Sequence, residues 1–119
     1  MISIENQLIE LIESVNLYMS KIPNGCTKIA EFLRDGQRDE AYNSISDFVE
    51  GIEWVSSSFN ILKNNNYSII FNEEKMKSLL LEVNDTLEQR DPNVLADLFE
   101  YEIASFFEEE SQLAIAKKM

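Results

Sequence analysis

Apolar side chains recur every three or four residues along most of this chain, which is the period of an amphipathic α-helix. In the first segment they stand at Ile4, Leu8, Leu11, Val15, Tyr18 and Ile22. Four later segments carry stripes of the same kind. We therefore predict an all-α fold, a bundle of four or five helices with antiparallel neighbours and short turns. The helices are expected over residues 3–21, 23–35, 39–63, 73–89 and 92–116, in one domain over residues 1–119.

The expected helix ends rest on residues that start or stop helices. Pro23 disfavours helical geometry in the residue before it and suits a first helical turn, which predicts a kink or short break there. Gly36 can take the left-handed conformation that ends a helix. Asp91 can cap free backbone N–H groups, and Pro92 suits the first helical position. Three consecutive asparagines at 64–66 compete with helix and place the longest irregular segment near 64–72.

The charge of the chain limits its partners. It has 22 acidic residues, 10 basic residues and no histidine, for a net charge of -12. Nucleic acids and anionic membranes are repelled by such a surface, so we expect neither to bind directly. No basic segment followed by an apolar run marks a leader, and no stretch approaches the roughly 18 apolar residues of a membrane span. The expected location is the cytoplasm.

Catalytic chemistry finds little support in the residues. Without histidine there is no Ser-His-Asp arrangement, no Cys-His pair and no ordinary zinc site. Cys26 is the single cysteine, so it forms no disulfide within the chain, and we interpret it as a small core or surface residue. Acidic pairs such as Glu50 and Glu53 are interpreted as solvated helix surface. We therefore predict no enzyme, no cofactor and no metal.

Three groups of residues are candidate partner-binding surfaces. The acidic residues between 82 and 110, including Glu100, Glu102 and Glu108, form either a solvent face or a site for a basic partner. The apolar group Tyr67, Ile69, Ile70 and Phe71 either folds over the end of the bundle or is exposed as a contact. Phe107 follows Phe106 directly, about 100° further around the helix. One groove does not easily cover both, so a second copy could bury Phe107 in a homodimer.

Trp54 stands beside the apolar stripe of its helix, between Ile52 and Val55. We expect it to be at least half buried at a helix contact, with its indole N–H bonded or reaching water. The alternative is an exposed anchor for a partner.

The passage from Leu87 to Ile103, LEQRDPNVLADLFEYEI, resembles a segment of an uncharacterised family of small acidic helical proteins from Gram-positive bacteria. The region from Gly36 to Trp54 is similar in style. This resemblance implies a helical fold and no particular activity. In size, acidity and helix number the chain is also similar to flagellar secretion chaperones, which implies a bundle that binds a helical substrate in an apolar groove.

Together these observations favour a non-enzymatic protein-binding module. It would be a helical adaptor or chaperone-like bundle that binds a helical or basic partner protein, or that associates with itself. The alternative is an acidic inhibitor that imitates a nucleic-acid backbone and blocks the basic groove of a DNA- or RNA-binding protein.

Overall fold

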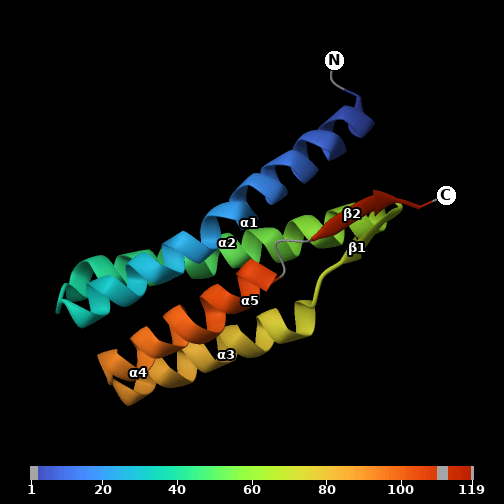
Figure 1. Ribbon diagram of the computed structural model, residues 1–119. Coiled ribbons are helices and arrows are strands. Elements are labelled where there is room, and N and C mark those ends of the chain that lie inside the picture. Colours follow the sequence, from blue (N-terminus) through green and yellow to red (C-terminus); the bar gives the residue numbers. More distant parts are fainter. Residues whose placement is uncertain (1–2, 110–112, 119) are drawn as a thin grey trace.

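A computed structural model of the chain describes residues 3–109 and 113–118. Four long helices make up most of this part (Figure 1). They are α1 (Ile4–Arg34), α2 (Arg38–Asn64), α3 (Glu73–Gln89) and a continuous last helix. The last helix consists of α4 (Pro92–Asp97), a π-helical turn η1 (Leu98–Ile103) and α5 (Ala104–Glu109). Two short strands accompany them, β1 (Tyr67–Ile70) and β2 (Ala114–Lys117). The predicted helical bundle is confirmed.

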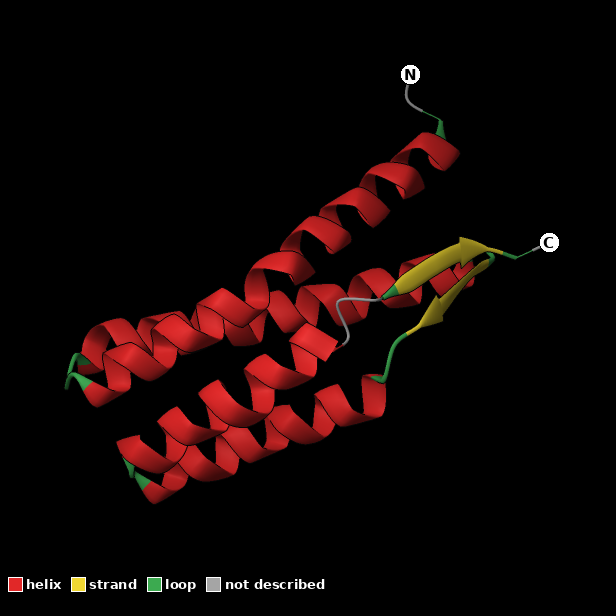
Figure 2. Cartoon of the chain, viewed as in Figure 1, coloured by secondary structure: helices red, strands yellow, loops and turns green. Residues whose placement is uncertain are grey.

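The helices form two antiparallel hairpins whose tight turns lie at the same end of the molecule (Figure 2). In the α1–α2 turn, Gly36 has a φ of 73°, which glycine adopts without steric cost. In the α3–α4 turn, the Asp91 carboxylate accepts hydrogen bonds from the N–H groups of Asn93 and Val94. Both predicted boundaries are therefore confirmed. The last helix packs along α1, and the molecule is elongated, with extents of 48 × 28 × 21 Å.

The predicted division of residues 3–35 into two helices is wrong, because α1 runs through Pro23 without interruption. Proline removes one backbone hydrogen bond and crowds the carbonyl four residues earlier, a cost of about 3 kcal/mol. The apolar stripe continues on both sides of it, and Met19, Ile22, Cys26 and Ile29 are all buried. Burial of a large apolar side chain contributes about 1.5–3 kcal/mol. The stripe therefore outweighs the proline and keeps the helix continuous.

The predicted end of the last helix is also wrong. The helix is described as far as Glu109, and residues 114–117 form β2, which pairs antiparallel with β1 in the register Ile69↔Ile115. Ile115, in turn, packs half-buried against a small cluster of Leu8, Leu62 and Tyr67.

Residues 64–72 interrupt the helices as predicted, but they are not wholly irregular, because β1 occupies 67–70. Asn66 takes a left-handed conformation, with a φ of 70°, and its carbonyl accepts a hydrogen bond from Lys118 N–H at 2.7 Å. The Ser68 hydroxyl donates to the Ala116 carbonyl. The C-terminal strand thus ties this segment to the bundle, which sequence spacing alone did not indicate.

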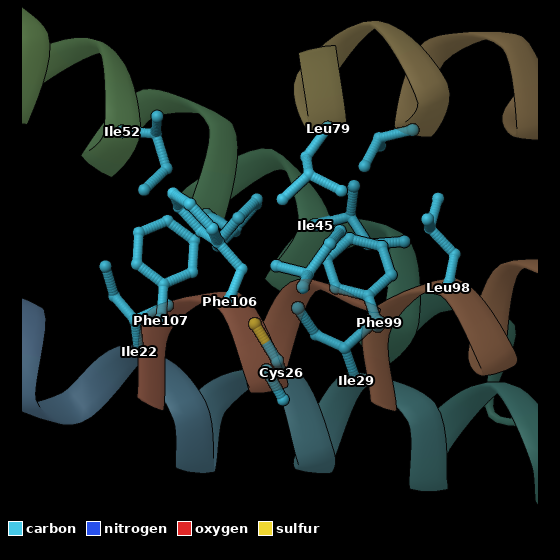
Figure 3. Close-up of a cluster of buried hydrophobic side chains, with 14 of the residues drawn as sticks. Ile22, Cys26, Ile29, Ile45, Ile52, Leu79, Leu98, Phe99, Phe106 and Phe107 are labelled. Carbon is cyan, nitrogen blue, oxygen red and sulfur yellow. The ribbon is translucent and has the colours of Figure 1, made fainter. Parts of the chain in front are cut away.

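The core lies between the two hairpins and contains side chains from all four long helices (Figure 3). The last helix contributes four adjacent pairs of buried residues: Leu95 and Ala96, Leu98 and Phe99, Ile103 and Ala104, Phe106 and Phe107. Successive pairs are three, five and three residues apart. The step of five coincides with η1, since a π-helical turn spans an additional residue. This turn keeps both columns of side chains facing the core.

Candidate functional site

A cavity of about 310 Å³ opens between α1 and α2. We call it the α1–α2 groove. It has mostly apolar and aromatic walls with a few polar groups, which is the usual character of a binding site in proteins. Its lining residues are Tyr18, Lys21, Ile22, Gly25, Lys28, Ile29, Phe32, Ser44, Asp47 and Phe48.

The α1 wall of the groove follows from a seven-residue spacing beside the buried stripe of that helix. Tyr18, Gly25 and Phe32 recur at this interval and therefore lie along nearly the same line of the helix surface. Gly25 has no side chain, and a Cβ added there would meet no other element within 4 Å. A glycine inside a helix costs about 1 kcal/mol relative to alanine. At this position it leaves the groove hollow between two aromatic rings.

The α2 wall depends on a second glycine. A Cβ added at Gly51 would lie 1.6 Å from the Tyr18 hydroxyl oxygen and 2.3 Å from the Tyr18 Cζ, so the tyrosine ring lies directly over this glycine. The ring also meets Trp54 edge-on, with centroids 5.8 Å apart and planes at 82°. Burial is the main reason that the pKa of Tyr18 is raised above its ordinary value, and Asp47 and Cys26 add to it.

Trp54 is 39% exposed, so the prediction that it is at least half buried at a helix contact is confirmed. Its exposed part continues the apolar surface of the groove. Ile61 follows two helical turns later on the same face and is 48% exposed, while Leu17, next to Tyr18, is 60% exposed. Together with the groove, these exposed side chains form a longer apolar strip on α1 and α2, which lie side by side near their common turn and separate toward the N-terminal end of α1 (Figure 1).

The two edges of the groove differ in charge. Lys21 and Lys28 stand on the α1 edge, both exposed, and neither forms an ion pair with any residue that the structure describes. Asp47 stands on the α2 edge. In a chain with a net charge of -12, two lysines free of acidic partners make the α1 edge a local exception.

The apolar segment at 67–71 mostly closes over the core, which was the first of the two predicted alternatives. Tyr67 is buried, and Ile69 and Phe71 are half-buried. The Phe71 ring lies 5.4 Å from that of Phe59 and 5.6 Å from that of Phe106. Ile70 alone points outward, with 71% of its surface exposed. The segment therefore supplies one exposed apolar residue rather than a contact surface.

The acidic candidates do not form one uniform surface. Glu100 and Asp97 both bind the guanidinium of Arg34, with 2.8 Å between Arg34 Nη2 and Asp97 Oδ1, and these hydrogen bonds raise the pKa of Arg34. Glu102 is exposed and lines a shallow hollow with Lys75. Glu108 is exposed near the end of α5. The row of acidic residues is thus interrupted by a salt bridge between α1 and the last helix.

Phe107 is only 2% exposed, and its burial overturns the reasoning that a second copy is needed to cover it. Its ring packs edge-on against Phe106 at 5.0 Å and Phe48 at 6.2 Å. The π-helical turn described above is the reason that one chain covers both phenylalanines. Any self-association must use another surface.

Cys26 and the carboxylates are the side chains that could supply a nucleophile or bind a metal. Cys26 is fully buried in the core, and this burial raises the pKa of its thiol to about 12. Over residues 3–109 and 113–118, no three side chains among His, Cys, Asp and Glu come together as metal ligands. None of the described helices is long and apolar enough to cross a membrane.

The residues that shape the groove were not singled out by sequence reasoning. Lys21, Gly25, Lys28 and Gly51 all lie inside helices, where periodicity directs attention to the buried stripe. The available signal was the glycines themselves, because a glycine in a helix interior destabilises the helix and commonly has a packing or functional reason.

With this geometry in place, comparison with known proteins assigns a family. Residues 10–112 match a family described as a domain of unknown function (DUF8042). The chain belongs to the DUF8042 family. The matched region includes the second helical hairpin, the first from residue 10 onward, and every residue that lines the α1–α2 groove. No curated protein and no solved structure matches the chain.

Proposed function

We propose that this DUF8042 protein is a non-enzymatic protein-binding module whose α1–α2 groove receives an amphipathic helix of a partner protein. The observation that carries the proposal is the open apolar strip between two antiparallel helices, hollowed at Gly25 and continued by Trp54 and Ile61. A third helix laid along such a strip is a recurring mode of recognition.

The length of the strip suits a helix better than a single side chain. From Ser44 to Ile61 the α2 wall spans 17 residue steps, or about 25 Å at 1.5 Å per residue. A partner helix of about five turns would cover it. Leu17, Trp54 and Ile61 would lose their remaining exposure, each contributing on the order of 1 kcal/mol, since they are already partly buried.

The charges of the two edges specify the partner further. Lys21 and Lys28 lie seven residues apart, so acidic residues at the same interval on one flank of the partner helix would face them. The opposite flank would face Asp47 and favour a basic or neutral residue. The proposed occupant is therefore an amphipathic helix with an acidic flank and a neutral or basic one.

The wider setting of this proposal rests on the sequence. We propose a cytoplasmic protein that binds neither nucleic acid nor membrane directly and needs no cofactor, in keeping with its charge and residue types. The resemblance to small acidic proteins of Gram-positive bacteria and the analogy with flagellar secretion chaperones support a bacterial adaptor or chaperone.

Site-specific photo-crosslinking in the native cell tests the groove directly. A photoreactive residue is placed at Lys21 or Lys28 on the edge of the groove, and at Lys77 on α3 as a control that is also exposed to solvent. We expect a protein adduct from both groove positions and none of the same mass from Lys77. The unlabelled variant Gly25→Leu, which places an apolar side chain in the hollow, should abolish capture of that protein, whereas Lys77→Gln should not.

Other outcomes would refute the proposal in distinct ways. Adducts of twice the chain mass, with a dimer by light scattering, would make a second copy the occupant. Capture of a basic nucleic-acid-binding protein that survives Gly25→Leu but is lost between about 0.1 and about 0.5 M salt would favour the nucleic-acid mimic instead. Absence of any adduct at Lys21 and Lys28 would show that the groove has no protein partner.

A further inference from the structure

A second and larger cavity, of about 500 Å³, lies at the end of the molecule where the two hairpin turns meet (Figure 2). We call it the turn cavity. One side comes from the α1–α2 turn and the start of α2, and the other from the α3–α4 turn. The side chains that matter here are Leu33, Arg38, Tyr42, Leu87, Arg90 and Pro92.

Two of the three arginines of the chain line this cavity. The third, Arg34, shows what an arginine ordinarily does in so acidic a chain, since it binds both Asp97 and Glu100. Neither Arg38 nor Arg90 forms an ion pair within the described residues. No carboxylate is among the residues that line the cavity.

The acidic residues next to these arginines in sequence are directed to other roles or to solvent. Asp91 follows Arg90, and its carboxylate caps α4 by accepting from two backbone N–H groups. Asp39 follows Arg38 and is exposed in the first turn of α2. Arg38 and Arg90 thus line one concave site, and the Asp91 carboxylate that borders it beside Arg90 is already engaged by two backbone N–H groups.

The backbone at both arginines is consistent with a positive site. Arg90 has a φ of 57°, a left-handed conformation at the end of α3 that glycine or asparagine usually occupies. Arg38 begins α2, and Gln37 before it provides no side-chain cap, so the positive end of that helix borders the same cavity. The N-terminal end of α2 therefore adds a partial positive charge to those of Arg38 and Arg90.

The remaining walls are apolar. Leu33, Leu87 and Pro92 offer hydrophobic surface, and the Tyr42 ring, which is 42% exposed, offers a flat face with a hydroxyl group. Small-molecule sites in proteins commonly have volumes of about 300–1,000 Å³ and mix apolar walls with a few placed polar groups. Guanidinium groups bind carboxylate and phosphate oxygens through paired hydrogen bonds.

We propose that the turn cavity binds a small organic anion, with a carboxylate or phosphate head held by Arg38 and Arg90 and an apolar body against Tyr42, Leu33 and Leu87. This site is separate from the α1–α2 groove and does not depend on the function proposed for it. The acidic surface around it excludes large polyanions, while a ligand with one anionic group meets the two positive charges at close range.

Titration of the full chain followed by amide NMR tests this site, at constant ionic strength, with phenyl phosphate, benzoate and inorganic phosphate as probes. We expect phenyl phosphate or benzoate to shift resonances of residues lining the turn cavity, and inorganic phosphate to bind at least tenfold more weakly. Arg38→Gln and Arg90→Gly should each weaken binding at least tenfold, while Lys77→Gln, which removes a charge elsewhere, should leave it unchanged.

Arg90→Gly separates loss of binding from loss of fold. Glycine is at ease in the left-handed conformation, so this variant should be at least as stable as the parent in urea while it loses the ligand. Equal affinity of the parent and both arginine variants would overturn the proposal. So would inorganic phosphate binding as tightly as phenyl phosphate, or no binding by any of the three probes up to about 10 mM.

Discussion

The two glycines inside the long helices provide the sharpest test of the groove, because the same substitution should have opposite effects at the two positions. Alanine is favoured over glycine in a helix interior by about 1 kcal/mol. At Gly25 nothing opposes this gain, since a Cβ would meet no other element within 4 Å. We expect Gly25→Ala to raise the free energy of unfolding by about 1 kcal/mol.

At Gly51 the new methyl group collides with Tyr18. Its Cβ would lie 1.6 Å from the tyrosine oxygen, so the ring must rotate away. Overpacking of this kind costs about 1–3 kcal/mol, and loss of the edge-on contact with Trp54 costs about 0.5–1.5 kcal/mol more. After the helix gain of about 1 kcal/mol is subtracted, Gly51→Ala should be less stable than the parent by about 0.5–3.5 kcal/mol.

Urea unfolding followed by circular dichroism measures both variants, and the fluorescence of Trp54, the single tryptophan, reports the movement of Tyr18. In a Tyr18→Ala background the collision is gone, and Gly51→Ala should become stabilising by about 1 kcal/mol, which gives a coupling energy of about 1.5–4.5 kcal/mol. If Gly51→Ala stabilises the parent as much as Gly25→Ala does, Tyr18 does not lie over Gly51 and our description of the groove wall is wrong.

Two further predictions concern the core. Phe107→Ala should lower the free energy of unfolding by about 3–5 kcal/mol, and Phe107→Glu should unfold the chain; a folded Phe107→Glu variant seen by circular dichroism would contradict this. The pKa of the Cys26 thiol is about 9 in the unfolded chain, and burial raises it to about 12 in the folded chain. The contribution of Cys26 to the free energy of unfolding is therefore complete below pH 9. It is lost as the pH rises toward 12, by about 1.4 kcal/mol per pH unit. Burial also raises the pKa of Tyr18, so this residue adds to the loss of stability above pH 10. Urea unfolding measured from pH 8 to pH 10.5 tests this: in Cys26→Ala, the loss of stability that begins at pH 9 should be absent.

Local signals in the sequence were sufficient to locate the helical segments and the two tight turns, but not the continuity of α1 or the strand at 114–117. The three- to four-residue period identified every long helix, and Gly36 and Asp91 marked turns because their chemistry acts within a few residues. Where local and distant forces compete, the sequence was misleading. Pro23 disfavours helix locally, yet the buried stripe on both sides of it keeps α1 continuous.

The end of the chain could not be predicted for a related reason. Residues 114–117 fit a helical stripe as well as a strand, and the choice depends on β1, almost fifty residues earlier, and on the cluster around Leu62. The position of Phe107 depends on a π-helical turn, which no residue pattern announced. The error came from the assumption that one chain cannot cover two successive residues of this helix, whereas adjacent pairs are buried along its length.

The two candidate sites were missed because each is a cavity between segments that are distant in the sequence. The α1–α2 groove requires open space beside Gly25 and the packing of Tyr18 against Gly51. These two glycines lie 26 positions apart in the sequence. The turn cavity requires Arg38 and Arg90 to meet, which follows only from the placement of both hairpin turns at one end. A stripe of apolar residues predicts which face is buried and not where packing is left incomplete.

The few basic residues of this acidic chain are placed selectively, and their positions support both proposals. Three of the ten join separate elements through ion pairs: Arg34, Lys63 and Lys117. Four others line the groove or the turn cavity, namely Lys21, Lys28, Arg38 and Arg90. A chain that needed acidity only for solubility would have no reason to place four basic residues along these two hollows. Because the surrounding surface repels extended polyanions, these hollows favour anionic groups that arrive on a helix or on a small molecule.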